Sequence, residues 1–198
     1  SSWYAHCPGL IVIAPWSAAD AKGLLKAAIR DPNPVVFLEN EVLYGQSFDV
    51  PKLDDFVIPI GRAKIVRPGT HVTLTAFSLM VGKTLEAAQK LAEEGIEAEV
   101  IDLRSLVPLD RAALLESVGR TGRLLVVDED YSSYSMSSEV IATVVEQGIG
   151  MLKAPPRRIA YPDIVVPFSP PMEQFALPNA DRIVAAARAM MAQEAAHG

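Results

Sequence analysis

The sequence is poor in cysteine and histidine and has no long hydrophobic run. Its single cysteine, Cys7, excludes an internal disulfide and fits a reducing compartment. The histidines, His6, His71 and His197, stand far apart, so no zinc-ligand spacing can be drawn. Because no run of about 18 apolar residues is present, no transmembrane helix is predicted. The sequence therefore indicates a globular protein that does not depend on disulfides or structural zinc.

Basic charge is also scarce. Lys and Arg number 18 against 24 Asp and Glu, which gives a formal net charge of -6. Nucleic-acid binding needs clustered Lys and Arg to neutralise phosphates, so a nucleic-acid partner is not expected. The chain begins SSWYAHCPGL, which lacks a basic region followed by an apolar stretch, so we do not expect a signal peptide there.

Several catalytic motifs are missing as well. The sequence has no GxGxxG after a strand pattern, no P-loop, no GxSxG and no HExxH. These absences weaken the hypotheses of a nicotinamide oxidoreductase, a phosphoryl transferase, a serine hydrolase and a zinc protease. Gly119–Gly122 lies between a predicted helix, which Gly119 would close, and a predicted strand. It does not open a helix, so we interpret it as a turn.

Residues 1–49 show a strand–helix–strand pattern. A buried strand is predicted at Leu10–Ala14 and another at Val35–Leu38. Between them, Ser17 caps a helix that Pro32 and Pro34 end. Consecutive strands joined by a helix are parallel, and two such strands cannot form an independent sheet. We therefore interpret residues 1–49 as the tail of a larger α/β domain.

A second α/β pattern follows a predicted linker at residues 50–70. The stretch Gln46–Arg67 is largely aperiodic, with a possible edge strand at Val57–Ile60. From His71 onward strands alternate with helices, which predicts a complete domain with a mostly parallel sheet over residues 71–198. The expected strands are Val72–Phe77, Ile96–Leu103, Leu124–Val127 and Arg157–Ala160, and the expected helices are Ser78–Glu94, Asp110–Val118, Ser137–Gln147 and one capped by Asn179.

The turn from Ala28 to Pro34 has two interpretations. It ends a helix, where main-chain oxygens lack intrahelical partners and carry partial negative charge, and Asp31 adds more. Such oxygens can ligate a hard cation. The alternative is a plain helix stop made by the prolines.

Two polar groups follow predicted strands, where open α/β sheets bind ligands. Asp128, Glu129 and Asp130 could hold a cation or act as acid and base, or could form a solvated loop or a subunit contact. Asp102 and Arg104 could form a structural contact or bind an anion. His6 and Cys7 are adjacent, so we do not expect them to act as base and nucleophile on one face.

Segments spread over nearly the whole chain resemble one family in the same order. They are WYAHCPGL at Trp3–Leu10, AAIRDPNPVVFLENEVLYG at Ala27–Gly45, GKTLEAAQKLAEEGIEAEVIDLRSLVPLD at Gly82–Asp110, VVDEDYSSYSMSSEV at Val126–Val140 and VPFSPPMEQFALPNADRI at Val166–Ile183. The chain is similar to the beta subunits of thiamine-diphosphate-dependent 2-oxo acid dehydrogenases, the decarboxylating component of pyruvate dehydrogenase-type complexes.

The resemblance implies the following architecture and ligands. Residues 1–49 correspond to the end of a pyrimidine-binding domain, and residues 71–198 to a transketolase C-terminal-type domain with three α/β/α layers. Thiamine diphosphate and magnesium lie between alpha and beta subunits, and the cofactor-activating Glu and an active-site His are expected upstream of Ser1. No catalytic or cofactor-binding residue is therefore assigned in this chain, which alone is expected to be inactive. The family's potassium ligands, main-chain oxygens, map to Ala28, Ile29, Asp31 and Asn33; Pro32 removes an amide but no carbonyl.

The resemblance also implies partners, a substrate and a location. The expected partners are the alpha subunit, a second beta subunit and the basic subunit-binding domain of the acyltransferase, facing acidic residues such as Asp163, Glu173 and Asp181. LENEVLYG favours pyruvate, whereas VPFSPPMEQ is reminiscent of acetoin-type and branched-chain subunits. A non-catalytic pairing and docking module is the alternative function. Transketolase and deoxyxylulose phosphate synthase share the C-terminal domain but give no account of LENEVLYG. The expected location is the cytoplasm, or the mitochondrial matrix in a eukaryote.

Overall fold

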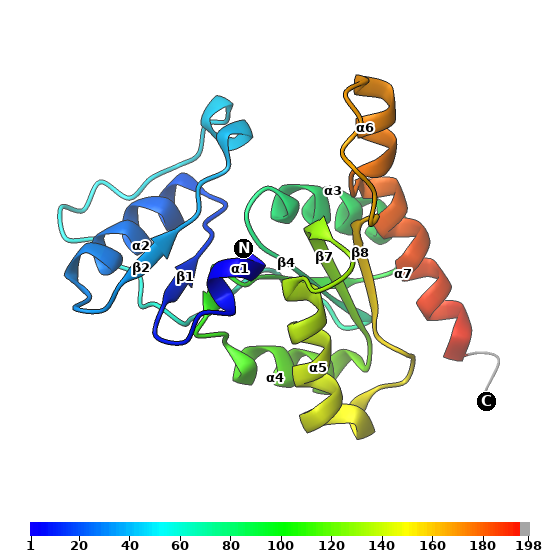
Figure 1. Ribbon diagram of the computed structural model, residues 1–198. Coiled ribbons are helices and arrows are strands. Elements are labelled where there is room, and N and C mark those ends of the chain that lie inside the picture. The colour runs from blue at the N-terminus through cyan, green and yellow to red at the C-terminus, as the bar shows by residue number, and fades with distance from the viewer. Residues whose placement is uncertain (195–198) are drawn as a thin grey trace.

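The computed structural model describes residues 1–194. His197, and the end of the domain predicted over residues 71–198, lie outside the described residues. The chain folds into two sheets with helices around them (Figure 1). The smaller sheet has the strand order β2-β1-β6, built from β1 (Ile11–Ile13), β2 (Val35–Phe37) and β6 (Ser105–Val107). Strands β1 and β2 are parallel, as predicted, and β6 runs antiparallel to β1.

Helix α2 (Ala18–Arg30) joins the two parallel strands. The Ser17 Oγ accepts a hydrogen bond from the Asp20 amide at 3.1 Å, which caps the helix as the sequence predicts. Leu24 is buried against β1, whereas Leu25 and Ile29 are exposed. The chain also forms a short helix α1 (Ser2–Ala5) before β1 and a 3-10 turn η1 (Glu41–Gly45) after β2.

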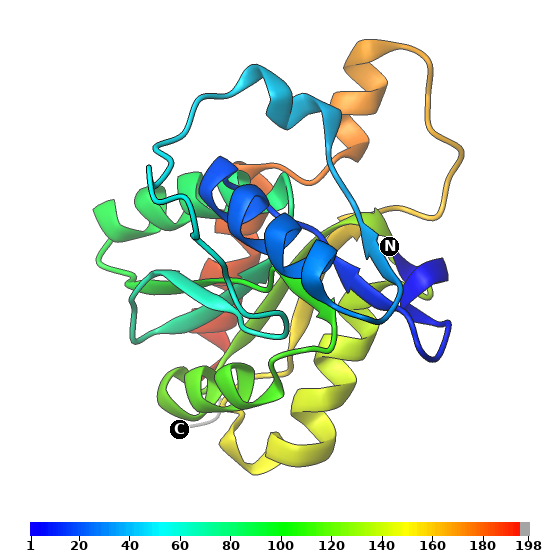
Figure 2. The same cartoon turned by 90° about the vertical axis from the view of Figure 1, so that its left-hand side faces the viewer.

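The stretch predicted as a linker contributes structure to both sheets. Val57–Ile60 forms no strand, and the edge strand is instead β3 (Lys64–Arg67), antiparallel to β5. Ile58 is prevented from pairing in a sheet because its amide donates to the Gly23 oxygen at 3.2 Å and its side chain packs on that glycine. Figure 2 shows this segment (cyan) beside α2 (blue).

We call residues 50–60 the strap. Basic side chains of α2 hold it in place. Lys22 Nζ donates to the Pro51 oxygen at 2.6 Å, Lys26 donates to the Asp54 oxygen, and Arg30 pairs with Asp55 at 2.7 Å. These contacts lie one helical turn apart along α2, because residues four apart share a face. The strap is therefore attached along the length of the helix.

The larger sheet forms the middle layer of a three-layer α/β/α domain, as predicted. Its strand order is β3-β5-β4-β7-β8, and every pairing except that of β3 is parallel. The strands are β4 (Val72–Ala76), β5 (Ala98–Asp102), β7 (Leu124–Tyr131) and β8 (Arg157–Tyr161). Helices α3 (Met80–Glu93) and α7 (Ala180–Glu194) cover one face, and α4 (Arg111–Thr121) and α5 (Met136–Gly148) cover the other (Figure 1).

Two details of this domain correct the sequence prediction. Helix α4 continues through Gly119 and ends at Gly122, whose φ of 71° is the left-handed conformation that glycine adopts without a Cβ penalty. The helix is prolonged because Ser117 and Thr121 both hydrogen-bond the buried Thr73 hydroxyl at 2.7 Å. Strand β6 was not predicted at all, and it carries the chain from the larger sheet back to the smaller one.

The segment between β8 and α7 projects from the domain. It contains α6 (Pro170–Ala176), which stands clear of both sheets in Figure 1. We call residues 164–176 the arm. Large apolar side chains of the arm are exposed, namely Ile164, Val165, Val166, Phe168, Met172 and Phe175. Exposed apolar clusters of this kind are typical of protein contact surfaces. None of the helices described over residues 1–194 has the length and apolar character needed to cross a membrane.

Candidate functional site

The topology creates a crevice at the carboxyl ends of β4 and β7. These neighbouring strands are followed by helices on opposite faces of the sheet, α3 after β4 and α5 after β7. Open α/β sheets bind ligands at such a switch point. A pocket of about 340 Å³ lies there, and its lining includes Phe77 and Ser78, which follow β4, and Asp128, Glu129 and Asp130 of β7.

Residues of the N-terminal part occupy the rim of this crevice. The Ser78 amide donates to the Ala14 oxygen at 3.3 Å. The Ser2 hydroxyl donates to Asp130 Oδ2 at 2.8 Å. Asn40 Nδ2 donates to both oxygens of Glu129, at 3.0 and 3.3 Å. We call this set of contacts the joint, because it fastens residues 1–49 to the place where the larger sheet would otherwise receive a ligand.

The acidic residues at the end of β7 therefore serve the fold. Asp128 is fully buried and accepts hydrogen bonds from the amides of Asp130 and Ser137, at 3.0 and 3.1 Å, the second at the start of α5. Burial raises the pKa of the Asp128 carboxyl, and it also raises that of Glu129. A solvated loop, one of the sequence interpretations, is wrong for this segment. Over residues 1–194, no cluster of three His, Cys, Asp or Glu side chains is arranged to hold a metal.

A second polar cluster lies beneath the joint. The Arg104 guanidinium bonds Asp20 of α2 at 2.5 Å, and the Ser17 hydroxyl donates to the other Asp20 oxygen at 2.6 Å. The Asp102 carboxylate accepts a hydrogen bond from the Arg104 amide at 3.0 Å, so the predicted contact between Asp102 and Arg104 exists through the Arg104 backbone. Sequence reasoning missed Asp20 as a partner, because its place in the first turn of a helix already explained a carboxylate there.

Asp102 has a perturbed carboxyl group. It is fully buried, and its Oδ2 has no hydrogen-bond partner within residues 1–194. Burial, followed by the nearby negative charge of Asp20, raises the pKa of Asp102 to about 7. Buried carboxyl groups with raised pKa values occur at functional sites and also in structural networks of charged residues.

The predicted cation turn forms a compact loop. Asp31 Oδ1 accepts hydrogen bonds from the amide and from the side chain of Asn33, both at 2.9 Å. The Asp31 amide donates to the oxygens of Ala27 and Ala28, at 3.0 and 3.3 Å. In the described part of the chain, no hydrogen bond of a turn, loop or side chain ends on the main-chain oxygens of Ile29, Asp31 or Asn33. Of the proposed potassium ligands, Ala28 and Ile29 lie in the last turn of α2, and Asp31 and Asn33 lie in the loop that follows. Their role stays a prediction.

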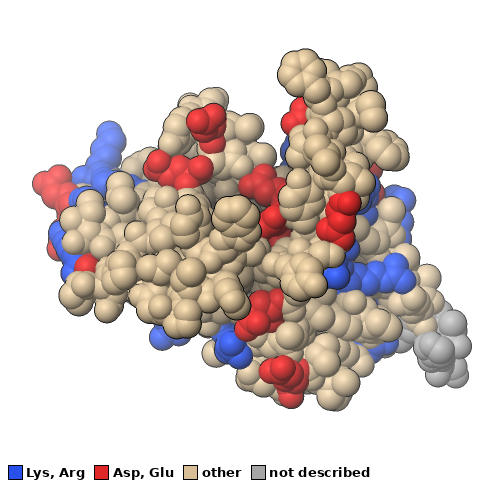
Figure 3. All heavy atoms as spheres, viewed as in Figure 1, with Lys and Arg blue, Asp and Glu red and all other residues tan. Residues whose placement is uncertain are grey.

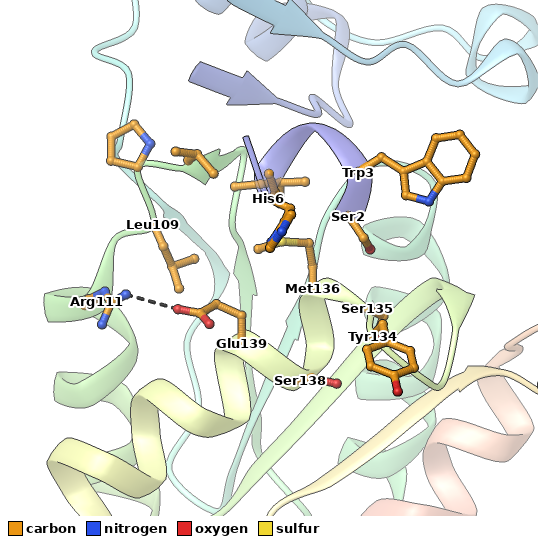
Figure 4. Close-up of a pocket in the computed structure, with 14 residues that line it drawn as sticks. Ser2, Trp3, His6, Leu109, Arg111, Tyr134, Ser135, Met136, Ser138 and Glu139 are labelled. Atoms are coloured by element: carbon orange, nitrogen blue, oxygen red, sulfur yellow. Dashed lines mark hydrogen bonds and ion pairs between the residues drawn. The ribbon is translucent and has the colours of Figure 1, made fainter. Parts of the chain in front are cut away.

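A larger pocket of about 970 Å³ lies on the other side of the N-terminal helix (Figure 4). Trp3 of α1 and His6, which follows the helix, line it together with Arg111 and Glu139, which form an ion pair at 3.1 Å. Cys7 does not line this pocket, and its Sγ donates to the Trp3 oxygen at 3.4 Å. The structure therefore does not pair His6 with Cys7 as base and nucleophile, in agreement with the sequence analysis.

Comparison with known families identifies both parts of the chain. Residues 61–183 match the family model described as transketolase, C-terminal domain, and residues 1–46 match the model described as transketolase, pyrimidine binding domain. The chain belongs to the transketolase C-terminal domain family, and the predicted fold is confirmed.

Individual relatives show which members of the family the chain resembles. The chain is 50% identical, over 96% of its length, to the pyruvate dehydrogenase E1 component subunit beta of Rhizobium meliloti. It is 54% identical, over 95% of its length, to the mitochondrial subunit beta-1 of the same component in Arabidopsis thaliana. The chain spans 41% and 53% of the lengths of these two relatives. The predicted family resemblance is therefore confirmed.

A solved structure shows the same fold at lower identity. It is described as a split gene transketolase, inactive beta4 tetramer, and it is 27% identical to the chain with a TM-score of 0.78. The match covers 96% of this chain and 60% of that one. The identity to pyruvate dehydrogenase beta subunits is about twice as high, which favours them over transketolase as the nearer functional relatives.

Proposed function

We propose that the chain forms the C-terminal part of the beta subunit of a pyruvate dehydrogenase-type enzyme. The reaction is oxidative decarboxylation of a 2-oxo acid, with acyl transfer to lipoyl groups of the acyltransferase. The single observation that carries this proposal is the identity of 50% to 54% with pyruvate dehydrogenase beta subunits across both parts of the chain. Pyruvate is the proposed substrate, and acetoin or a branched-chain 2-oxo acid is the alternative.

The described residues do not by themselves supply a site for thiamine diphosphate. Asp128 and Asp130 accept hydrogen bonds from the chain itself, and Glu129 accepts the Asn40 amide. The cofactor and its magnesium would be held by the alpha subunit and by the rest of the beta subunit. The contribution of this chain is to fix the pyrimidine-binding part against the C-terminal domain through the joint. The isolated chain is expected to be inactive.

The partner proposal rests on the arm and on the charge around it. Phe168 and Phe175 are exposed residues of the arm, and Figure 3 shows that few charged atoms cover the arm on this face. Of the acidic residues predicted to face the acyltransferase, Asp163 is held by Ser132 and Ser133, and Asp181 pairs with Lys90 at 2.9 Å. Glu173 forms no hydrogen bond or ion pair through its side chain within residues 1–194, which leaves it available to a basic partner.

The assembly we propose contains the alpha subunit, a second beta subunit and the subunit-binding domain of the acyltransferase. Pairing of two beta chains is supported by the split transketolase of similar fold, which forms a tetramer of beta subunits. The proposed location is the cytoplasm, or the mitochondrial matrix in a eukaryote, since the similar Arabidopsis thaliana subunit is mitochondrial. The turn at Ala28, Ile29, Asp31 and Asn33 is the proposed potassium site of this assembly.

The partner proposal is tested by titrating the chain with the subunit-binding domain of the cognate acyltransferase at low and high ionic strength. Binding is expected at low salt and weaker binding at high salt, because exposed charge pairs are screened. Glu173→Gln should reduce the binding, and Glu116→Gln, on the distant helix α4, should not. Absence of binding at low salt by a folded chain would remove the docking role and leave the pairing role.

A further inference from the structure

Arg104 occupies the point where the chain crosses between the two sheets. It lies between β5 of the larger sheet and β6 of the smaller one, and its φ of 58° is left-handed, which is rare for a residue with a side chain. Its main-chain oxygen accepts the Ala14 amide at 2.8 Å. Its guanidinium bonds Asp20 of α2. Arg104 therefore holds the smaller sheet and its helix to the larger sheet with both main chain and side chain.

The charges around Arg104 do not balance. Asp20 and Asp102 are both buried, at 1% and 0% exposure, and the guanidinium of Arg104 bonds Asp20. The other titratable group that acts on Asp102 is Lys64 of β3, an exposed edge-strand residue. The Ser17 hydroxyl donates to Asp20 and not to Asp102. If both carboxyl groups were ionised, one buried negative charge would have no close partner.

The hydrogen bonds point to Asp102 as the group that carries a proton. Asp20 accepts hydrogen bonds from the guanidinium and from the Ser17 hydroxyl, so each of its carboxylate oxygens has a donor. Asp102 receives one backbone amide, and its second oxygen receives none within residues 1–194. A buried carboxylate oxygen without a donor is unfavourable, and protonation removes the charge. The raised pKa of Asp102, about 7, agrees with this assignment.

We propose that Asp102 is a proton-controlled latch on the attachment of residues 1–49 to the C-terminal domain. With Asp102 protonated, Arg104 is committed to Asp20 and α2 stays docked. When Asp102 loses its proton, two carboxylates compete for one guanidinium. The Arg104 Nε has no partner among the described residues, so the guanidinium can turn toward Asp102 and release Asp20. The proton leaves to solvent, and no other co-reactant is needed.

Trp16 offers a direct reporter of this latch. It precedes Ser17 in the chain, stacks edge-on against Phe48 with ring centroids 5.4 Å apart, and packs on the core that surrounds β4 and α3. The only other tryptophan of the sequence, Trp3, is 88% exposed. In a Trp3→Phe background, the fluorescence of the chain therefore comes from Trp16 alone, and its emission shifts to longer wavelength if water reaches the ring.

The test compares this background with Asp102→Asn and with Glu116→Gln in the same background. Glu116 is an exposed carboxylate of α4, so its variant controls for the loss of a charge. The expected result is a red shift of Trp16 emission with a midpoint near pH 7 in the parent and in Glu116→Gln, and constant emission from pH 5.5 to 8.5 in Asp102→Asn. Asparagine keeps the shape and the acceptor of the protonated side chain.

A second measurement keeps the proposal falsifiable if the variant folds poorly. The carboxyl carbon of Asp102 can be followed by NMR in the Trp3→Phe chain itself, and its titration should coincide with the fluorescence change. The proposal is overturned if Asp102→Asn shows the same fluorescence transition as the parent. It is also overturned if Asp102 titrates without any change in Trp16 emission, or if Asp102 is already ionised at pH 5.5.

Discussion

Asn40 and Glu129 lie 89 residues apart in the sequence, yet the Asn40 amide donates to both carboxylate oxygens of Glu129. The amide comes from the segment after β2, and the carboxylate from the end of β7. This contact places the LENEVLYG segment, which the chain was expected to share with pyruvate dehydrogenase beta subunits, directly on the ligand crevice of the C-terminal domain. The two parts of the chain are thus joined at the carboxyl ends of β4 and β7.

Removal of the Asn40 side chain should loosen this joint. Asn40→Ala leaves the partly buried Glu129 without its amide donor, which should destabilise the chain by about 1–3 kcal/mol. Asn40→Asp should cost more, because it places a second negative charge beside Glu129. Urea unfolding measures both. Tyr44→Phe, which removes only the exposed hydroxyl bonded to Glu39, serves as control and should stay within about 0.5 kcal/mol of the parent. Equal stability of Asn40→Ala and the parent would contradict the structural role of the contact.

Asp102→Asn should change how stability depends on pH. The carboxyl has a folded-state pKa of about 7 against an ordinary value of 3.8. Between these values the unfolded chain is ionised and the folded one protonated, so stability falls as pH rises through this window and is level above it. The full difference is on the order of 4 kcal/mol as an upper bound. The variant should therefore be more stable than the parent at pH 8 and close to it at pH 4, as measured by denaturant unfolding. A constant difference at all pH values would contradict the raised pKa.

Gly23→Ala should detach the strap. A Cβ at this position would lie 2.6 Å from Ile58 Cγ1, so the Ile58 side chain, or the strap that carries it, must shift to make room. Alanine favours a helix by about 1 kcal/mol over glycine, and overpacking costs about 1–3 kcal/mol, so a net loss is expected. Limited proteolysis should then cut residues 50–60 faster.

The matched control for this variant is Gly45→Ala. A Cβ at Gly45 meets nothing within 4 Å, and the same substitution there should leave the cleavage rate of the strap unchanged. Cleavage in the parent should begin in the exposed stretch of residues 49–55 and leave a fragment that retains β3. If Gly23→Ala and Gly45→Ala are cut at equal rates, the packing of Ile58 on α2 does not hold the strap.

The potassium site proposed at the turn after α2 implies that potassium stabilises the chain more than a cation that cannot bind there. If the main-chain oxygens at Ala28, Ile29, Asp31 and Asn33 ligate potassium, KCl should stabilise the chain relative to tetramethylammonium chloride at equal ionic strength. The gain is about 2.7 kcal/mol when the ion is present at about 100 times its dissociation constant. Asp31→Ala removes the acceptor that shapes the turn and should abolish the difference between the salts, whereas Asp49→Ala should preserve it. Equal melting temperatures of the parent in both salts would refute the site.

The sequence predicted most of the larger sheet because its strands and helices carry strong periodic patterns. Val72–Ala76 and Leu124–Val127 are buried strands, each followed by a helix, and strands that alternate with helices are expected to form a parallel sheet. The helix capped by Asn179 was predicted correctly, and the Asn179 side chain accepts the Arg182 amide at 3.0 Å. Local signals of this kind suffice wherever one element packs on its neighbour in the chain.

The sequence did not reveal contacts that depend on distant residues. Strand β6 is only Ser105–Val107, and it forms because β1 offers it an edge. The sequence of the strap has no periodic apolar pattern because its residues lie along helix α2 and do not form part of a sheet. Asp20, Asp102 and Arg104 look like ordinary cap and loop residues, and their coupling arises only when α2 is placed against the end of β5. One local feature of the sequence could have indicated the joint: Asn40, an amide side chain, lies between the acidic residues Glu39 and Glu41.

The most direct test of the central claim is catalysis by a hybrid beta subunit. The segment of the Rhizobium meliloti subunit that matches this chain is replaced by residues 1–198, and the hybrid is purified with the alpha subunit of that enzyme. Turnover of pyruvate, branched-chain 2-oxo acids and acetoin is then measured with an artificial electron acceptor. We expect the hybrid to assemble and to turn over pyruvate fastest, and we expect no activity when residues 1–198 are supplied alone. An assembled hybrid that is inactive with pyruvate, or that prefers a branched-chain substrate, would contradict it.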